Sequence, residues 1–199
     1  ARTIDANSPW TAGHSERVTT TALEIGRRLQ VDAPSLDRLR RGGLLHDIGK
    51  IGVPATILDK PGPLTDAERT VIQSHPTIGA EIIRPIAALQ DIIPLVLSHH
   101  ELLDGSGYPE GLASSAIPEL VRILTVADIY DALVSDRPYR AGLGQQGALK
   151  ILQDGADRRY DGPSVRALTA AVAEGWSSKA TERPALPQLE APLPVEAVT

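Results

Sequence analysis

Apolar residues recur every three or four positions over most of the chain, a spacing typical of amphipathic helices. Between Thr11 and Gln30 this stripe consists of Val18, Ala22, Ile25 and Leu29. The same pattern predicts further helices at about 34–47, 65–74, 76–83, 92–100, 118–135, 144–154 and 163–175. No run of alternating apolar and polar residues indicates a strand. The chain is therefore expected to be all-α, a helical bundle.

Local signals mark several helix ends. Thr65 is followed three residues later by Glu68, which is the pattern of a capping box. Pro76 is expected to restart a helix, and Pro118 suits the first residue of the long helix that follows it. These signals place two helix starts near 65 and 118.

Two internal segments are expected to be loops. Residues 51–64 are punctuated by Pro and Gly, and residues 102–117 contain three Gly or Pro within 104–109. Loops as long as the second one are usually functional or disordered, and we interpret it as an ordered loop over a site. Residues 1–176 are then expected to form one catalytic domain, and the Pro-rich residues 177–199 an extended or disordered tail.

The 199 residues include five His and no Cys. The absence of Cys excludes a disulfide scaffold, a Cys-ligated zinc site, an iron–sulfur cluster and a Cys nucleophile. A transition metal in this chain would be held by imidazoles and carboxylates.

The charge balance limits the classes of partner. Asp and Glu outnumber Lys and Arg by 25 to 20, a formal charge of −5, which argues against binding of DNA or RNA polymers through a large basic surface. No apolar run is long enough for a membrane span, and no signal peptide precedes the helices, so a soluble, cytoplasmic protein is expected. The absence of Met leaves open whether the initiator was removed or the chain is a fragment.

Several ionisable residues coincide with the apolar stripes of the predicted helices. They are His14, His46, Asp47, His75, His100 and Asp128. A lone His in such a position is usually a hydrogen-bonded core residue, but unpaired buried charges cost several kcal/mol each, so a group of them needs a common partner. The adjacent pairs 46–47 and 99–100 can each present ligands to two neighbouring sites, as a dinuclear metal centre requires. Mixed imidazole and carboxylate donors suit Fe, Mn, Zn, Ni or Co.

Four ordered motifs carry a family resemblance. They are HDIGK at 46–50, HPTIGAEI from His75, HHELLDGSGYPEGL at 99–112 and ADIYDALVSDRPYR at 127–140. Over about residues 8–155 the chain resembles the HD-GYP domain, a group within the HD phosphohydrolase superfamily. The resemblance implies an all-helical HD-domain bundle with an ordered GYP loop and a metal site that hydrolyses the bacterial second messenger cyclic di-GMP.

The resemblance also implies the metal ligands. Asp47 would bridge two metals, His46 and Asp128 would hold one of them, and His75, His99 and His100 would hold the other. His14 matches a histidine that some members use for an additional metal. Those members carry a Glu four residues earlier, where this chain has Trp10, so we expect two ions, Fe or Mn, with His14 a weak ligand or only a hydrogen-bond partner of one.

Catalytic and substrate contacts follow from the same resemblance. Two metals generate a hydroxide at neutral pH that attacks phosphorus, and Lys50 would neutralise the charge that develops on the phosphate. Arg137, Arg140, Tyr108 and Asp131 are expected to contact the substrate. Alternatives remain open: Lys50 as an exposed loop residue, Arg137 as a helix cap, Tyr108 as a staple of the GYP loop, and Asp131 as a residue that orients a ligand or pairs with an arginine. Glu101 and Asp104 are expected to hydrogen-bond to the ligand imidazoles.

The expected function is hydrolysis of cyclic di-GMP to pGpG, with GMP as a further product. Two other hypotheses are a catalytically weak module that senses the dinucleotide or docks a partner, and an HD hydrolase of another nucleotide. The resemblance further allows a protein partner at the GYP loop, a homodimer, and fusion to or pairing with a regulatory domain.

Overall fold

Helices form the regular structure of the computed structural model, which describes residues 13–60, 62–135 and 142–178. The α-helices are α2 (His14–Arg28), α3 (Ala33–Leu45), α4 (Ala55–Leu58), α5 (Asp66–Gln73), α6 (His75–Ile83), α7 (Ile93–Leu97), α8 (Glu119–Val134), α9 (Gln145–Asp154) and α10 (Gly162–Ala173). Short 3-10 helices are η1 (Ile48–Gly52), η2 (Ala87–Ile92) and η3 (Ser114–Ala116). Within the described ranges there are two isolated β-bridges and no strand, so the predicted all-α class is confirmed.

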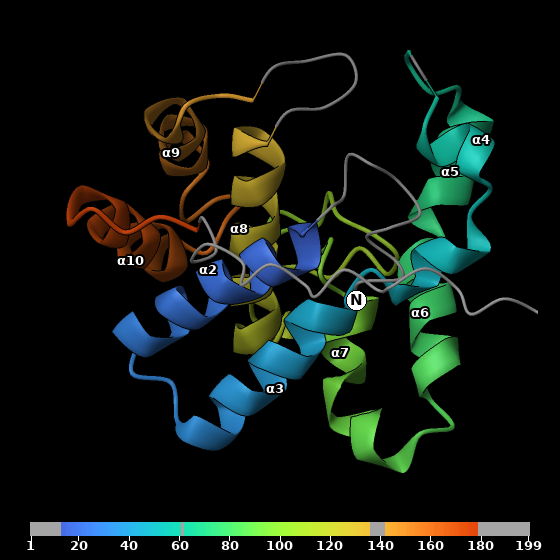
Figure 1. The fold of residues 1–199 in the computed structure, drawn as a ribbon, viewed down its shortest axis with the longest axis horizontal. Coiled ribbons are helices and arrows are strands. Elements are labelled where there is room, and N and C mark those ends of the chain that lie inside the picture. The colour runs from blue at the N-terminus through green and yellow to red at the C-terminus, as the bar shows by residue number, and fades with distance from the viewer. Residues whose placement is uncertain (1–12, 61, 136–141, 179–199) are drawn as a thin grey trace, which may run out of the picture.

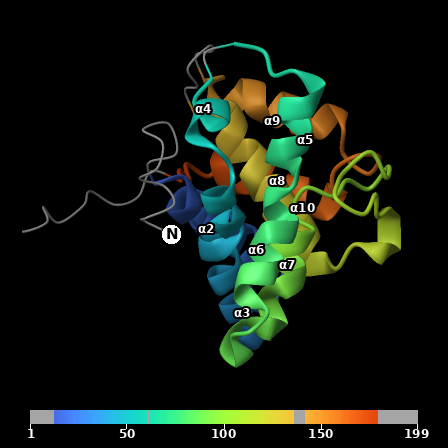
Figure 2. The same ribbon diagram turned by 90° about the vertical axis from the view of Figure 1, so that its right-hand side faces the viewer.

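Helix α8 runs through the middle of the molecule, with α9 and α10 on one side and α4 and α5 on the other (Figure 1). It packs against α2, α3, α7, α9 and α10. Its apolar residues Val121, Ile123 and Leu124 are fully buried. In the second view, α6 and α7 descend side by side next to α3 (Figure 2). Five of the helices thus pack around α8 in one core.

Two glycines near the end of α3 let this helix approach its neighbours closely. A Cβ atom at Gly43 would lie 2.7 Å from the Thr19 hydroxyl oxygen on α2, and one at Gly42 would lie 2.5 Å from a methyl carbon of Leu95 on α7. Because neither contact tolerates a side chain, these positions need glycine. The close approach brings the residues that follow α3 into the interior.

Most predicted helix boundaries are close to the observed ones. The capping box at the start of α5 is confirmed, with the Glu68 amide 3.3 Å from the Thr65 hydroxyl and the Thr65 amide 2.8 Å from the Glu68 carboxylate. Pro118 is the cap that precedes α8, which begins at Glu119, so its prediction as the first helical residue was wrong by one position. Pro76 is the second residue of α6, which begins at His75.

The segment 51–64 is only partly a loop. It contains the end of η1 and the one-turn helix α4. Pro54 caps α4 at its N-terminus, where a fixed φ favours a turn and a missing amide proton costs nothing. The sequence pattern predicted that Pro54 belongs to a loop, whereas it precedes a short helix.

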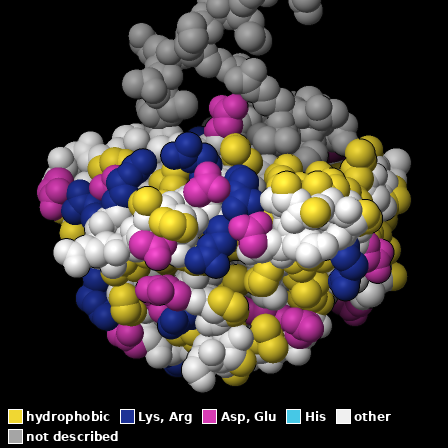
Figure 3. All heavy atoms as spheres, turned by 90° about the horizontal axis from the view of Figure 1, so that it is seen from below, with side chains coloured by type: hydrophobic (Ala, Val, Ile, Leu, Met, Phe, Trp, Pro, Cys, Tyr) yellow, Lys and Arg dark blue, Asp and Glu magenta, His cyan; other side chains and the backbone are white. Residues whose placement is uncertain are grey.

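The face seen from below carries Lys and Arg side chains interspersed with Asp and Glu (Figure 3). Charged side chains also pair between elements. Arg41 on α3 lies 2.6 Å from Asp91 in η2, and Arg28 on α2 lies 2.7 Å from Glu174 after α10. In the described part of the chain no helix combines the length and apolarity that crossing a membrane requires.

Three sequence expectations concern residues outside the described ranges. They are the tail beyond residue 178, the segment with Arg137 and Arg140, and the position of Trp10.

Candidate metal centre

The histidines and aspartates of the predicted metal site come together from five parts of the chain, mostly at helix ends. His14 is the first residue of α2, and His75 is the first residue of α6. The pairs 46–47 and 99–100 follow the last residues of α3 and α7. Only Asp128 lies inside a helix, α8. The expectation that His46, Asp47 and His100 lie within helices, on their apolar stripes, was therefore wrong, because α3 ends before the first pair and α7 before the second.

Three imidazole rings are oriented by the same local device. The Nδ1 atom of each ring hydrogen-bonds to the backbone carbonyl three residues earlier: His46 to Gly43 at 2.7 Å, His75 to Ile72 at 2.7 Å and His99 to Val96 at 2.9 Å. Because a carbonyl only accepts, Nδ1 must carry the proton. Each ring is left with a lone pair on Nε2.

The Nε2 atoms of these rings lie in the buried interior, and in the neutral rings none of them carries a proton. His75 Nε2 and His99 Nε2 are 3.3 Å apart, and the buried His46 Nε2 has no hydrogen-bond partner among the described residues. Lone pairs facing one another in a buried site repel, and a buried acceptor without a donor costs about 1–3 kcal/mol. A cation among them removes both penalties, so the donors fit a metal ion.

The carboxylate of Asp47 lies between two groups of imidazoles. Its Oδ1 atom is 3.2 Å from His75 Nε2 and 3.9 Å from His99 Nε2. Its Oδ2 atom is 3.4 Å from His46 Nε2 and 3.5 Å from His14 Nε2. Two sets of donor atoms are each compact enough for one ion: Asp47 with His75, His99 and His100, and Asp47 with His14 and His46. Asp47 is common to both, as a bridging ligand would be.

Asp128 borders both sets from α8. Its Oδ1 atom is 3.3 Å from His14 Nε2 and 4.0 Å from His46 Nε2. Its Oδ2 atom is 3.7 Å from His100 Nδ1. The structure therefore brings together all seven predicted ligands, His14 included.

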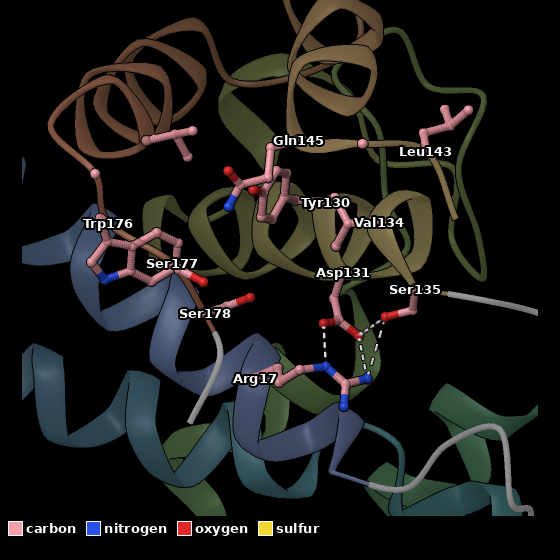
Figure 4. A pocket seen from close by; sticks show the side chains of 13 residues that line it. Arg17, Tyr130, Asp131, Val134, Ser135, Leu143, Gln145, Trp176, Ser177 and Ser178 are labelled. Atoms are coloured by element: carbon pink, nitrogen blue, oxygen red, sulfur yellow. Dashed lines mark hydrogen bonds and ion pairs between the residues drawn. The ribbon is translucent and has the colours of Figure 1, made fainter. Parts of the chain in front are cut away.

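His14 is held by a buried carboxylate on the side away from the other ligands. Its Nδ1 atom is 2.8 Å from Asp131 Oδ2, and Asp131 is itself only 1% exposed. Arg17, one turn further along α2, donates from Nε to Asp131 Oδ1 at 2.7 Å and from Nη2 to Oδ2 at 3.0 Å (Figure 4). A carboxylate behind a histidine is the usual support of a metal ligand. Asp131 therefore contacts His14 and pairs with an arginine. These are the two roles that the sequence analysis left open beside a substrate contact.

The electrostatics of the site favour ligands in their metal-binding states. Burial, together with the neighbouring imidazoles, lowers the pKa of His99 well below its ordinary value, and burial lowers the pKa of His100 to about 3. Burial alone would raise the pKa of Asp47, but the Lys50 ammonium and the His46 imidazole hold it well below its usual range. Neutral imidazoles and ionised carboxylates are the forms that bind metals.

The pKa of His14 is shifted in the opposite direction from those of His99 and His100, because carboxylates surround it. Burial opposes a proton there, yet the hydrogen bonds that His14 donates to the carboxylates of Asp128, Asp131 and Asp47 raise its pKa above the ordinary value. Excess negative charge around this imidazole thus attracts a cation, and a metal ion would meet the same charge.

Lys50 lies in η1, directly beside the Asp47 carboxylate. Its Nζ atom is 2.6 Å from Asp47 Oδ2, and its side chain is 22% exposed. The alternative of an exposed lysine without contact to the site is therefore wrong. The ammonium group stands at the edge of the metal centre, where a phosphate could reach it.

The GYP loop is ordered by Glu101, in a role different from the one expected. Glu101 is 1% exposed, and its carboxylate accepts hydrogen bonds from the amides of Glu110, Gly111 and Leu112 at 2.7, 3.1 and 2.9 Å. Asp104 accepts from the amide and hydroxyl of Ser106. The expected hydrogen bonds from these carboxylates to imidazoles are not among those found in the described residues. Both side chains satisfy loop amides instead, since a turn rich in Gly and Pro leaves these groups unpaired.

Tyr108 of the same loop lies over a ligand histidine. The ring centroids of Tyr108 and His100 are 4.7 Å apart with an interplanar angle of 31°. Tyr108 is therefore both part of the loop that it was expected to staple and a neighbour of the candidate metal centre.

Arg17 was not predicted from the sequence, and Glu101 was predicted in a different role. Arg17 lies three residues after His14, and Glu101 follows the histidine pair directly. The sequence shows how many positions separate each residue from a predicted ligand. It does not show the groups to which they hydrogen-bond, because these groups lie on other segments. Arg137 and Arg140 lie outside the described residues.

The fold and the site together define a helical domain with a buried cluster of His and Asp side chains that could hold metal ions. A family model described as the HD domain matches residues 1–163. The chain therefore belongs to the HD domain family, and its GYP loop and its relatives place it in the HD-GYP group.

Curated relatives and a solved structure are similar to this chain. The 3'3'-cGAMP-specific phosphodiesterase 3 of Vibrio cholerae is 42% identical over 169 residues, covering 85% of this chain and 37% of its own length. The cyclic di-GMP phosphodiesterase PA4108 of Pseudomonas aeruginosa is 38% identical over 172 residues, covering 85% and 41%. The structure of Bd1817, an HDG"Y"P protein from Bdellovibrio bacteriovorus, has a TM-score of 0.68 over 84% of this chain and 53% of its own, at 20% identity, a likeness of fold alone. The chain thus spans about two fifths of the curated relatives it matches.

Proposed function

We propose that the chain is a metal-dependent phosphodiesterase that hydrolyses cyclic di-GMP to pGpG, and further to GMP. The observation that carries this proposal is the Asp47 carboxylate, with one oxygen facing His75 and the other facing His46 and Lys50. Relatives at 38% identity or more that are named cyclic dinucleotide phosphodiesterases support it.

The proposed centre holds two ions, Fe or Mn. His46, Asp128 and Asp47, with His14, would hold one ion, and Asp47 with His75, His99 and His100 would hold the other. Nitrogen and oxygen donors without thiolate support these metals. Two such ions, when bound, lower the pKa of water and offset the negative charge of a phosphodiester.

The residues of the chain add orientation and charge. Lys50 would donate to a non-bridging phosphate oxygen, which gains negative charge as the phosphodiester reacts. Its ammonium is already held at the centre by Asp47, so little rearrangement is needed. In this proposal Asp131 and Arg17 hold His14 instead of contacting the substrate, because Asp131 is almost wholly buried. Arg137 and Arg140 remain predicted phosphate or guanine contacts.

A second candidate substrate is 3'3'-cGAMP. It is favoured by the relative from Vibrio cholerae, which is 42% identical and is named for this dinucleotide. The two substrates differ in one purine, so the same metal centre can serve both.

The remaining expectations stay with this proposal. A bacterial second messenger as substrate places the activity in the cytoplasm. A protein partner at the GYP loop, a homodimer, a fused regulatory domain, and the division of the chain into a domain over 1–176 and a tail from 177 stay predictions.

Incubation of the anaerobically purified, Fe- or Mn-loaded protein with cyclic di-GMP, 3'3'-cGAMP and cyclic di-AMP, followed by chromatography of the products, tests the proposal. We expect linear products from cyclic di-GMP, with faster or slower cleavage of cGAMP deciding between the candidates. Tight binding without products would favour the sensing module, and cleavage only of another nucleotide would favour a different HD hydrolase. Either result would refute the proposal.

A further inference from the structure

A pocket of about 340 Å³ adjoins the metal centre at His100. Small-ligand pockets in proteins range from about 300 to 1,000 Å³, so this one is large enough for a flat heterocycle. Its walls include Gln73 at the end of α5, His100, Ser106 and Tyr108 from the GYP segment, and Arg159 and Tyr160 from the link between α9 and α10. A ligand whose phosphate lies at the metal centre could place its base there.

Aromatic rings with fixed positions form part of this pocket. The Tyr108 amide hydrogen-bonds to the His100 carbonyl at 3.3 Å, and its ring lies over the His100 ring. The Tyr160 ring packs on Gly155, where a Cβ atom would lie 2.7 Å from it, so this position needs glycine. Nucleic-acid bases stack on such rings regardless of their identity.

The turn that carries Arg159 is joined to the GYP loop. The Tyr160 amide hydrogen-bonds to the Gly155 carbonyl at 3.1 Å, and the Asp157 amide to the Tyr160 carbonyl at 2.9 Å. The Leu103 amide hydrogen-bonds to the Arg159 carbonyl at 3.1 Å. The backbone on both sides of the pocket is therefore held in place before a ligand arrives.

Arg159 is the cationic residue of the pocket. Its guanidinium carbon lies 5.9 Å from the centre of the Tyr160 ring, and it forms no ion pair with the described residues. A longer-range attraction links it to Asp104. The guanidinium N–H groups of Arg159 are therefore available to a ligand, whereas most other described arginines form ion pairs with carboxylates.

We propose that this pocket is a guanine subsite, in which Arg159 donates to O6 and N7 of one base of the substrate while the base stacks on the tyrosine rings. Guanine offers two acceptors on this edge, whereas adenine offers one acceptor and one donor, so an arginine fork selects guanine. The inference rests on the proposed function and names the residues that select its substrate.

The test compares Arg159→Ala with Arg158→Ala, the neighbouring exposed arginine that does not line the pocket. We expect Arg159→Ala to raise KM for cyclic di-GMP at least about fivefold, the factor that loss of one bidentate guanine contact costs. Its kcat on bis(p-nitrophenyl) phosphate, which has no base, and its metal content should not change. Arg158→Ala should match the wild type in all three.

Binding of GMP and AMP to the metal-loaded protein is measured in parallel, so that the subsite is tested even without turnover. The proposal expects tighter binding of GMP than of AMP, and loss of that difference in Arg159→Ala. Equal KM and equal GMP binding in the two arginine variants would overturn it. Failure of the wild type to cleave any cyclic dinucleotide would overturn the proposed function, while GMP selectivity that depends on Arg159 would still support the subsite.

Discussion

At the scale of single residues, the candidate centre depends on which nitrogen of each imidazole carries the proton. Backbone carbonyls hold Nδ1 of His46, His75 and His99, and Asp131 holds Nδ1 of His14. The Nε2 atoms of all four rings thereby face the Asp47 carboxylate before any ion binds. The site is preorganised for a cation, and its free energy without one includes the cost of unpaired buried acceptors.

Replacement of Lys50 should separate metal binding from turnover. Lys50→Ala removes the ammonium beside Asp47 but none of the imidazoles. Loss of one charged group that stabilises a transition state typically lowers kcat about 10²- to 10³-fold. We expect that loss with an unchanged metal content, measured by elemental analysis and steady-state kinetics. Lys60→Ala, which removes a lysine paired with Glu68 outside the centre, is the control and should keep its kcat. A Lys50→Ala enzyme with wild-type kcat would contradict the assigned role.

Loss of the carboxylate behind His14 should weaken metal binding. Asp131→Ala removes the acceptor of the His14 ring and the carboxylate that pairs with Arg17. Mutation of such outer partners costs about 10- to 100-fold in metal affinity. Titration of metal into the apoprotein should show this loss, with partial recovery in Asp131→Asn, which retains an oxygen acceptor. Asp154→Ala, on the exposed face of α9, should bind metal like the wild type. Equal affinities in all variants would exclude a positioning role for Asp131.

At the scale of elements, the ligands are placed by where helices begin and end. Helix α3 ends at Leu45 and α7 at Leu97, so the pairs that follow them turn into the interior. Helix α6 begins at His75, beside η1. The contact between η1 and α6 thus sets how far His75 lies from Asp47.

A side chain at Gly49 should disturb this contact. A Cβ atom there would overlap the His75 carbonyl oxygen and lie 2.5 Å from the Gly79 amide nitrogen. Overpacking of this kind typically costs about 1–3 kcal/mol. We expect Gly49→Ala to lower the free energy of unfolding of the metal-free protein by that amount in urea titrations. Gly147→Ala in α9, where the nearest atom is 3.5 Å away, should raise it by about 0.5–1 kcal/mol. The same small change in both variants would show that the η1–α6 contact is looser than described.

At the scale of the whole molecule, periodicity predicted the helices, because it depends on short-range spacing, whereas the resemblance to the HD-GYP domain implied the ligand set. Contacts between distant segments were beyond that reasoning: His14 meets Asp131 across 117 positions, and Glu101 acts on a loop that folds back over it. The order of the motifs identified the residues of the centre, whereas the three-dimensional path of α2 past α8 was needed to assign Arg17 and Asp131. Helix ends were misplaced where proline begins a helix instead of interrupting one.

The central claim is that Asp47 joins two metal sites in one catalytic centre. Elemental analysis of wild type and Asp47→Ala, combined with product analysis on cyclic di-GMP, tests it most directly. We predict about two equivalents of Fe or Mn and linear products for the wild type, and fewer than two equivalents with no hydrolysis for Asp47→Ala at unchanged helical circular dichroism. A folded Asp47→Ala protein that retained two equivalents of metal and cleaved cyclic di-GMP at the wild-type rate would contradict the claim.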